Sequence, residues 1–281
     1  MSTVDGSGMG SALRQDTAAG TADRGEQPLR TSDGRHLTLA AYRDLPRHAE
    51  LWQLADEGRL REYVRHGWLQ PGASPAPIRG AHAELIVVTD PDGRPVASLR
   101  KIHAVGRAEV RRLPSMAMLL REQALTEPGG ALLHRIVAGR PVAELAGLWK
   151  DPAYPSDVKM ALYRRAMHDA VDRREVMLLA AVAPEFRALR NLFGERVVRS
   201  VGAPVRVRER GVSRSVTLHP AVIDPQTFFA DLLDDAERAG TAGDEPASLW
   251  RQQIMWDMLR GYPWQHLPAA LRARLEQLCP A

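Results

Sequence analysis

The chain has 281 residues, of which 44% are hydrophobic and 26% are charged. This balance is typical of a globular domain whose core is large enough to fold without disulfides or structural metals, and the single cysteine, Cys279, excludes an intrachain disulfide. The formal net charge of +4 permits nucleic-acid binding without requiring it.

The first 34 residues are rich in small polar side chains and poor in apolar ones. Such a segment cannot bury enough apolar surface to offset the loss of chain entropy, and we expect it to be disordered. It lacks the basic-then-apolar order of a signal peptide, and no apolar run in the chain reaches the ~20 residues that span a bilayer, so we expect a cytoplasmic protein. We expect the folded domain to cover residues 35–222 and a helical extension to cover residues 223–281.

The first elements after the tail are a strand, a helix and a hairpin. Residues 36–42 alternate in polarity and predict a strand, and residues 48–66 carry apolar side chains near helical spacing. Residues 82–89 predict a second strand. The turn sequence at 90–93, Asp-Pro-Asp-Gly, then leads into a return strand at 94–103. This is the clearest hairpin of the chain.

The middle of the chain predicts alternating helices and strands. We expect a helix at 114–123, with Pro128-Gly129-Gly130 as a stop signal, and a strand at 142–150. Ser156 and Asp157 are N-cap candidates for a helix that runs to about residue 174, because a side-chain oxygen there can accept a free backbone N–H. A continuously apolar stretch follows, which is typical of a central strand covered on both faces.

That apolar strand covers residues 176–183, and a short helix with proline in its first turn follows at 184–193. Two final strands are expected at 197–208 and 213–219. The helical extension is expected to contain three helices, at residues 228–238, 249–259 and 267–278.

From residue 36 onward, this order of elements resembles the GNAT acyltransferase fold. The residues that carry the resemblance are the strand–turn–helix unit at 142–174 and the strand–helix unit at 177–194. The resemblance implies a mixed α/β (α+β) domain with a mostly antiparallel sheet, helices on its flanks and a splayed central strand pair. The helical extension would be appended to it.

Within that family, the chain is most similar to the branch of acyl-homoserine-lactone synthases and N-acyl amino acid synthases. The sequence Glu144-Leu145-Ala146-Gly147 is similar to the branch's Glu-Leu-x-Arg strand, although glycine replaces the arginine. The glycine-containing phosphate loop of ordinary acetyl-CoA-binding members has no counterpart in residues 154–160. Phe193 stands where the family often has a tyrosine acid.

The resemblance implies roles for residues on the strand and at the following helix. Glu144 would be the base that takes a proton from an incoming amine, and Trp149 would wall the acyl channel beside backbone N–H groups that stabilise an oxyanion. The donor arm would be held at the start of the helix. The residues expected to bind it are Lys150, Tyr154, Ser156 and Lys159.

Two arginine-rich runs could dock a partner through acidic groups or phosphates, which would be an acyl carrier protein or an RNA acceptor stem. The residues we select from them are Arg100, Lys101, Arg206 and Arg208. Neither His-x-x-x-His nor Cys-x-x-Cys occurs, so we predict no metal site and no tightly bound cofactor.

The leading hypothesis is an N-acyltransferase that moves an acyl group from a thioester, carried by an acyl carrier protein or CoA, onto a small-molecule amine. Such a reaction would suit secondary metabolism, including antibiotic biosynthesis. Two alternatives remain open at this point: an aminoacyl transferase that uses aminoacyl-tRNA, and a non-catalytic GNAT-like module that binds a ligand or partner. The missing glycine loop and Phe193 favour the second alternative.

Overall fold

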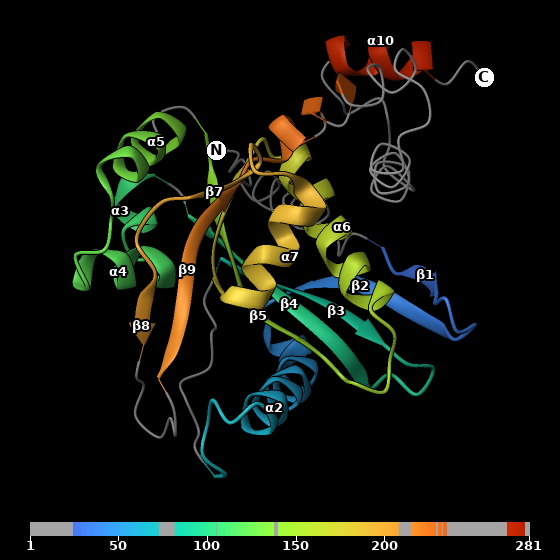
Figure 1. Ribbon diagram of the computed structural model, residues 1–281. Coiled ribbons are helices and arrows are strands. Elements are labelled where there is room, and N and C mark those ends of the chain that lie inside the picture. The colour runs from blue at the N-terminus through green and yellow to red at the C-terminus, as the bar shows by residue number, and fades with distance from the viewer. Residues whose placement is uncertain are drawn as a thin grey trace, which may run out of the picture.

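The computed structural model describes residues 25–72, 82–104, 106–137, 140–207, 215–228, 230–231, 233–234 and 269–278. Within these residues, strands from the whole domain form one sheet in the order β1-β2-β3-β4-β5-β6-β9-β7, and β8 pairs with β9 (Figure 1). The strands are β1 (Gln27–Arg30), β2 (His36–Arg43), β3 (Ala83–Thr89), β4 (Pro95–Ala104), β5 (Val142–Lys150), β6 (Val176–Val182), β7 (Val198–Ser200), β8 (Val205–Val207) and β9 (Val216–Ile223).

The strand pairs are antiparallel except for β5 and β6, which run parallel in the middle of the sheet. A parallel pair needs a crossover connection, and the helix α6 (Asp157–Asp172) supplies it. The expected fold class, a mixed and mostly antiparallel sheet flanked by helices, is confirmed.

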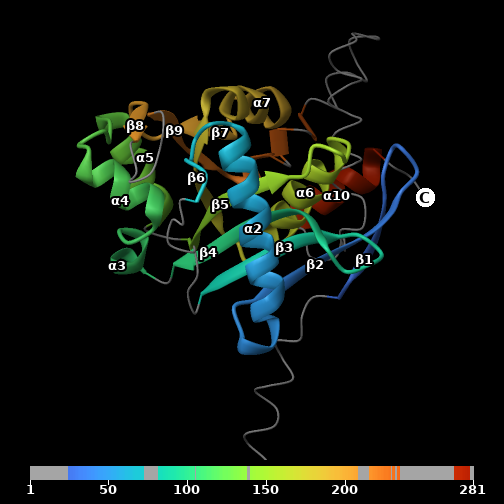
Figure 2. The same ribbon diagram turned by 90° about the horizontal axis from the view of Figure 1, so that it is seen from below.

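Helices cover both faces of the sheet. On one face lie α2 (Ala49–Arg65), which follows the 3-10 turn η1 (Pro46–His48), and the helices α3 (Arg107–Val110), α4 (Pro114–Arg121) and α5 (Glu127–Val137). On the other face lie α6 and α7 (Ala183–Phe193). Figure 2 shows α2 crossing the sheet over β3 to β5, on the side opposite α6.

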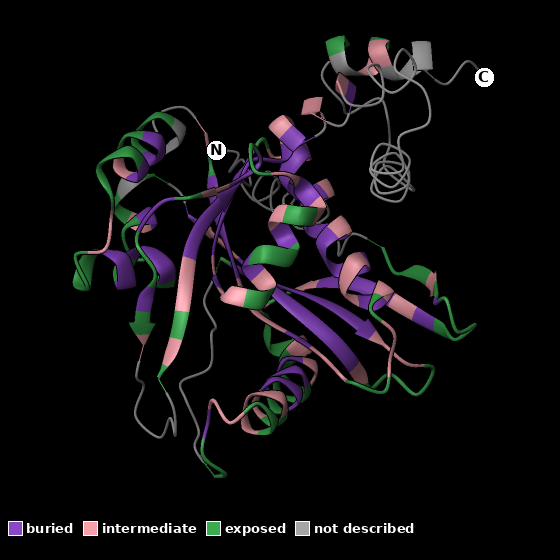
Figure 3. Cartoon of the chain, viewed as in Figure 1, coloured by how far each residue is buried: buried purple, intermediate pink, exposed green. Residues whose placement is uncertain are grey.

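The alternation of side chains along β5 explains why both faces need cover. Val142 packs into a cluster with Leu119 and Leu133 from α4 and α5, whereas Leu145 packs into the larger cluster with Leu162 of α6. The central strands are therefore covered on both faces, and Figure 3 shows buried residues concentrated there.

The structure corrects three sequence-based expectations. The strand expected at 197–208 is two short strands, β7 and β8, which pair with different parts of β9. Gln27–Arg30 forms the edge strand β1 against β2, so residues 27–30 are not disordered as expected. The stop signal at Pro128-Gly129-Gly130 instead lies in the first turn of α5. Proline is favoured there because the N–H that it lacks would have no helical partner. Gly129 is needed at that place, since a Cβ would lie 1.9 Å from the carbonyl oxygen of Val201.

The helical extension is described in part. Residues 225–228, 230–231 and 233–234 are helical, and α10 (Ala269–Leu278) carries Arg274, which pairs with Asp234 at 2.6 Å. The expected helix at 249–259 and the expected disorder of residues 1–24 lie outside the described residues, as does Cys279. Among the helices that are described, none has the length and apolar character of a membrane span.

Candidate functional site

The parallel pair at the centre of the sheet comes apart after four residues. The pairing of β5 with β6 runs from Val142–Val176 to Leu145–Leu179 and then stops, although both strands continue. Beyond that point, the facing edges of the two strands have no strand partner among the described residues. The expected splayed strand pair is therefore confirmed, and it leaves backbone N–H and C=O groups for a ligand to satisfy.

A bulge in β5 accompanies the parting of the strands. The register of β5 against β4 shifts between Arg100–Ala146 and Ser98–Trp149, so two residues of β5 oppose the single residue Leu99. One of the two is Gly147, whose φ of +62° favours glycine. The bulge lies directly after the last residue of β5 that pairs with β6, Leu145, so the two irregularities coincide.

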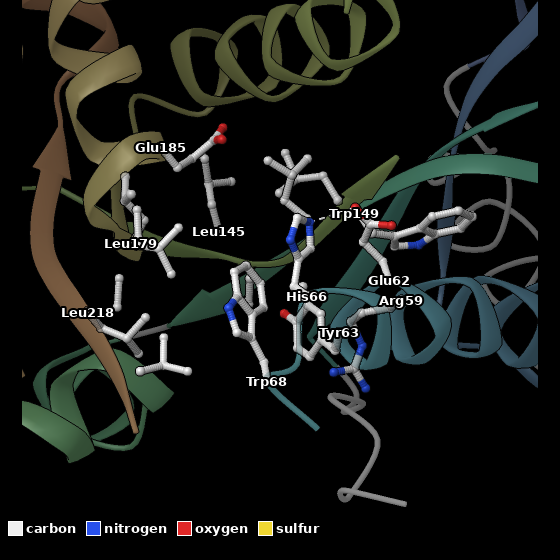
Figure 4. A pocket seen from close by; sticks show the side chains of 18 of the residues that line it. Arg59, Glu62, Tyr63, His66, Trp68, Leu145, Trp149, Leu179, Glu185 and Leu218 are labelled. Atoms are coloured by element: carbon white, nitrogen blue, oxygen red, sulfur yellow. Dashed lines mark hydrogen bonds and ion pairs between the residues drawn. The ribbon is translucent and has the colours of Figure 1, made fainter. Parts of the chain in front are cut away.

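An open cavity of about 350 Å³ lies at the parting, within the size range of small-molecule sites. It is lined from both sides of the sheet, by α2 and the residues after it on one side and by α6 and α7 on the other (Figure 4). The polar and aromatic side chains that line it are Arg59, Glu62, Tyr63, His66, Trp68, Trp149, Lys150, Lys159, Tyr163 and Glu185. Most of the remaining wall is apolar, with leucines, valines and alanines of β5, β6, β8 and β9.

Trp149, which the resemblance predicts to wall an acyl channel, lines this cavity and is 4% exposed. Its indole packs onto α2 at Gly58, where a Cβ would lie 2.3 Å from the ring. The indole Nε1 is buried without a hydrogen-bond partner. A buried donor without an acceptor costs free energy, so a ligand acceptor at this position would be stabilised.

The end of α2 contributes a histidine–carboxylate pair to the cavity wall. His66 Nε2 lies 2.9 Å from the Glu62 carboxylate, and Trp68 stacks on the His66 ring with centroids 4.8 Å apart. Hydrogen bonds from Arg65 and His66 lower the pKa of Glu62, which therefore stays ionised. Arg65 Nη2 also lies 3.3 Å from His66 Nε2. A carboxylate only accepts, so Nε2 carries the ring proton when it donates to Glu62, and Nδ1 is then the nitrogen that can take another.

On the opposite side, α6 and α7 bring three polar groups together. The Tyr163 hydroxyl donates to Glu185 at 2.8 Å, and Lys159 Nζ pairs with the other carboxylate oxygen at 3.1 Å. Burial, with the Glu185 carboxylate, raises the pKa of Tyr163 well above its usual value, so the hydroxyl stays protonated. Phe193 is fully buried and packs edge-on against Tyr163, with ring centroids 6.1 Å apart.

The predicted donor-binding residues divide between the cavity and the surface near it. Lys150 and Lys159 line the cavity, and the Lys150 ammonium donates to the carbonyls of Asp151 and Tyr154. Burial lowers the pKa of Lys150, and the nearby Lys159 acts in the same direction. Tyr154 lies outside the lining and stacks under Arg35, at 4.6 Å.

The start of α6 contacts the N-terminal hairpin. Ser156 precedes the helix without a side-chain capping bond. The Asp157 carboxylate accepts the backbone N–H of Ser32 at 2.6 Å. Neither expected N-cap therefore caps α6 through its side chain, and an acidic group occupies the helix end where the resemblance predicts the donor.

Glu144 does not line the cavity. It lies in the paired half of β5, is 3% exposed, and its carboxylate accepts the backbone N–H and hydroxyl of Ser115, at 3.0 and 2.7 Å. Ser115 is in the first turn of α4, so Glu144 satisfies a helix N-terminus from a neighbouring strand. Burial raises the pKa of Glu144 to about 7. The predicted role as base has no geometric support.

The predicted docking residues of β4 are fully buried, so they cannot meet a partner at the surface. Arg100 and Lys101 are each 0% exposed, because they are adjacent residues of a central strand with helices on both faces. Lys101 pairs with Glu175 at 2.6 Å, and Glu175 also contacts His103. Of the other two residues, Arg206 is exposed on β8, and Arg208 lies outside the described residues.

Several cavity residues were not singled out from the sequence. The spacing of Glu62 and His66, four residues apart on one helix face, was the available signal. Tyr163 and Glu185 are 22 residues apart in the chain, and no local pattern connects them. For the part of the chain that the structure describes, no group of three His, Cys, Asp or Glu residues could hold a metal ion.

No family model matches the chain, and no curated protein matches it. Among solved structures it is similar to FeeM, an N-acyl amino acid synthase from uncultured soil microbes, at 10% identity over 73% of this chain and 95% of that one, with a TM-score of 0.47. It is also similar to BjaI, a CoA-dependent acyl-homoserine lactone synthase with SAM and isopentyl-CoA, at 15% identity over 76% and 97% of the two chains, with a TM-score of 0.46.

An agmatine N-acetyltransferase in its apo form is similar at 14% identity over 66% and 98% of the two chains, with a TM-score of 0.43. The resemblance to GNAT-type acyltransferases is therefore found among solved structures as a similarity of fold. These TM-scores are below 0.5, so the functional argument depends on this chain's own strand pairing and cavity.

Proposed function

We propose that the chain is an N-acyltransferase that moves an acyl group from a thioester onto an amine and forms an amide. The observation that carries this proposal is the cavity at the parted ends of β5 and β6, which reaches polar groups on both faces of the sheet. A thioester carbonyl held in the gap would find backbone groups along one edge. Two reactants could then approach it from opposite faces, which holds them in position for direct transfer.

In this reaction the amine nitrogen attacks the thioester carbonyl carbon, and the carbonyl oxygen becomes an oxyanion. The backbone N–H groups left unpaired beyond Leu145 are the donors that would stabilise it. His66, oriented by Glu62, would take the proton that the amine loses. The C–S bond then breaks and the donor leaves as a thiolate. The Tyr163 hydroxyl, which donates to Glu185 in this structure, would turn to give the thiolate a hydrogen bond and keep its own proton.

The segment between β5 and α6 lacks the glycine-containing loop that usually binds the phosphates of the donor. Residues 151–160 contain no glycine, and the Asp157 carboxylate lies at the start of α6. A carboxylate repels a diphosphate at close range. These features favour a donor whose pantetheine arm enters alone, as an acyl carrier protein would present it. Arg206, exposed on β8, remains the candidate for contact with an acidic carrier.

The test is a product assay with three donor classes: octanoyl-CoA, octanoyl carrier protein and leucyl-tRNA. Each is mixed with a panel of amines, and we expect free thiol and an N-acyl product by mass spectrometry with a thioester donor. Turnover with leucyl-tRNA alone would support the aminoacyl-transfer alternative. Binding of acyl-pantetheine without turnover, for every donor, would support the non-catalytic alternative.

A matched pair of variants connects any activity to the cavity. Ala180 lines the gap on β6, and Ala180→Trp should fill it and reduce turnover at least ~100-fold, since a misplaced reactant loses the advantage of position. Ala188→Trp adds the same side chain on the exposed face of α7 and should leave turnover unchanged. Equal turnover in the two variants would contradict a reaction in this cavity.

A further inference from the structure

Lysine is rare in this chain, and each lysine lies in the interior or in the cavity wall. Of the 38 lysines and arginines, three are lysines, at positions 101, 150 and 159. Lys101 is 0% exposed and is paired with Glu175, whereas Lys150 and Lys159 both line the cavity. Lysine differs from arginine in that its pKa can fall far enough for the amine to become a neutral nucleophile. The two cavity lysines are therefore the candidates for a reaction at a side-chain amine.

The two cavity lysines differ in their hydrogen-bond partners. Lys159 Nζ is paired with the Glu185 carboxylate at 3.1 Å, as is typical of an ammonium. Lys150 Nζ donates to the carbonyl oxygen of Asp151 at 2.8 Å and to that of Tyr154, so both of its partners among the described residues are neutral. A neutral amine has two N–H groups and a lone pair. These two carbonyls satisfy its donors and leave the lone pair free.

The charges around Lys150 favour the neutral form. Burial lowers the pKa of Lys150, and the positive charges of Lys159 and Arg65 act in the same direction. The carboxylates of Asp151 and Glu62 act in the opposite direction but do not reverse the shift. At neutral pH, a larger share of Lys150 than of an ordinary lysine is therefore nucleophilic.

Lys150 also lies at the parted edge of the sheet. It ends the stretch of β5, from Ala146 onward, that has lost its pairing with β6. The proposed thioester carbonyl would lie along this stretch, beside the unpaired backbone groups. A lysine amine is carried on a flexible four-carbon stem, so it can leave its two carbonyl partners and reach into the cavity that it lines.

We propose that Lys150 is a modification site, whose amine takes the acyl group of a thioester donor when no acceptor amine is present. The proposal rests on the proposed acyl transfer for the identity of the donor. The lone pair of Nζ attacks the thioester carbonyl carbon, an N–C bond forms and the C–S bond breaks. The sulfur leaves as a thiolate and takes up, through solvent, the proton that the nitrogen loses. The products are Nε-acyl-lysine and a free thiol, and the modified chain should accumulate because an amide resists hydrolysis.

The first experiment incubates the full chain, without an acceptor amine, with each of three thioesters: octanoyl-CoA, octanoyl carrier protein and S-octanoyl-N-acetylcysteamine. Peptide mass spectrometry then locates the octanoyl groups. We expect Lys150 to be acylated at least ~10-fold faster than Lys159, because only a neutral amine attacks a thioester. An unmodified Lys150 with all three donors overturns the proposal. Equal acylation of Lys150 and Lys159 also overturns it, in favour of nonselective acylation.

The second experiment uses variants to connect the modification to the cavity. Lys150→Arg keeps the positive charge without the nucleophile and should abolish the mass gain of the intact chain. Ala180→Trp, which fills the gap at β6, should slow acylation of Lys150 at least ~10-fold, because the donor is no longer held in position. Ala188→Trp, on the exposed face of α7, is the matched control and should not. Acylation of Lys150 at the full rate in Ala180→Trp overturns the proposal.

The two proposals fail separately. Acylation of Lys150 without amide formation from any small-molecule amine would keep the modification site and remove the proposed N-acyltransferase. Amide formation by a chain whose Lys150 stays unmodified would keep the N-acyltransferase and remove the modification site.

Discussion

Between Val142 and Leu145, β5 is paired with strands on both sides, whereas from Ala146 to Lys150 it keeps only β4 as a neighbour. The first half carries Glu144, and the second half carries Trp149 and the glycine of the bulge. Each half therefore buries a polar group, the carboxylate of Glu144 or the indole N–H of Trp149. The two groups differ in whether the protein supplies a hydrogen-bond partner.

In the paired half, the protein itself satisfies the polar group. Glu144 receives hydrogen bonds from Ser115 and connects β5 to α4. In the parted half, donors remain unsatisfied: the Trp149 indole N–H lacks an acceptor, and so do two nitrogens of Arg100 behind Gly147. A carboxylate with a raised pKa on a central strand is therefore no sign of a functional site by itself. Unsatisfied groups that border a cavity are the better indicator.

The largest expected effect is the pH dependence of stability that Glu144 causes in the paired half of β5. The folded pKa of Glu144 is raised to about 7 from 4.5, so its contribution to stability is fully present below about pH 4.5 and is lost as the pH rises through about 7. That change amounts to about 3 kcal/mol in the free energy of unfolding. Glu144→Gln removes the titration, and denaturant unfolding between pH 4 and 8 should show a flatter profile.

The same variant should retain acyl transfer, because the carboxylate does not face the cavity. Parallel stability profiles for the variant and the unaltered protein, together with lost turnover, would contradict the structural role and restore Glu144 as a base. Glu144→Gln therefore decides between the two interpretations of this residue.

The second expected effect is on catalysis in the parted half. His66→Gln should lower kcat about 100-fold, since a positioned base contributes at least that much to a proton transfer. The loss should shrink as the pH rises and the amine deprotonates in solution. His134→Gln changes an exposed histidine of α5 and serves as the control. A variant with full activity at every pH would exclude His66 as the base.

A third prediction concerns the contact that holds Trp149 in the cavity wall. Gly58→Ala would place a Cβ 2.3 Å from the indole, and we expect a loss of about 2 kcal/mol in the free energy of unfolding. Gly130→Ala in α5 is the matched control, because its nearest neighbour would lie 3.6 Å away. Without a clash, alanine should stabilise the helix by up to about 1 kcal/mol. Urea titrations of both variants check that the free energy of unfolding falls for Gly58→Ala and rises for Gly130→Ala.

The smallest expected effect concerns the leaving group. Tyr163→Phe should lower kcat about 10-fold with an alkyl thioester, because the departing thiolate loses a hydrogen-bond donor. With a thiophenyl ester, whose thiolate leaves readily, the loss should nearly disappear. Tyr154→Phe removes a hydroxyl outside the cavity and should change neither rate. Equal losses with both esters would mean that Tyr163 only positions α6 against Glu185.

The sequence predicted most elements of the domain because their signals are local. The hairpin at β3 and β4, the apolar run of β6 and the proline-initiated α7 each have a pattern within a few residues. A local pattern cannot assign an element when the same residue is favoured in two different positions. Pro128 can end a helix or begin one, and the packing of Gly129 against the backbone of Val201 fits the second.

Of the residues that the resemblance placed on the strand and at the following helix, Trp149, Lys150 and Lys159 line the candidate cavity. Arg100 and Lys101 look like a basic surface in the sequence, but they are buried because β4 has strands on both sides and helices on both faces. Burial of this kind depends on elements distant in the chain, which no short window contains.

Hydrophobic periodicity and turn residues act over short stretches of chain, so the sequence alone was enough to predict the order of strands and helices and the turn that leads from β5 into α6. The mixed sheet was expected only from the resemblance to a known fold. The folded chain was needed to show where β5 and β6 separate, that the Glu144 carboxylate of β5 caps a helix, and which donors remain unsatisfied beside a cavity. Those outcomes depend on the balance of hydrogen bonds and burial between segments far apart in the sequence, and that balance exists only once the chain has folded.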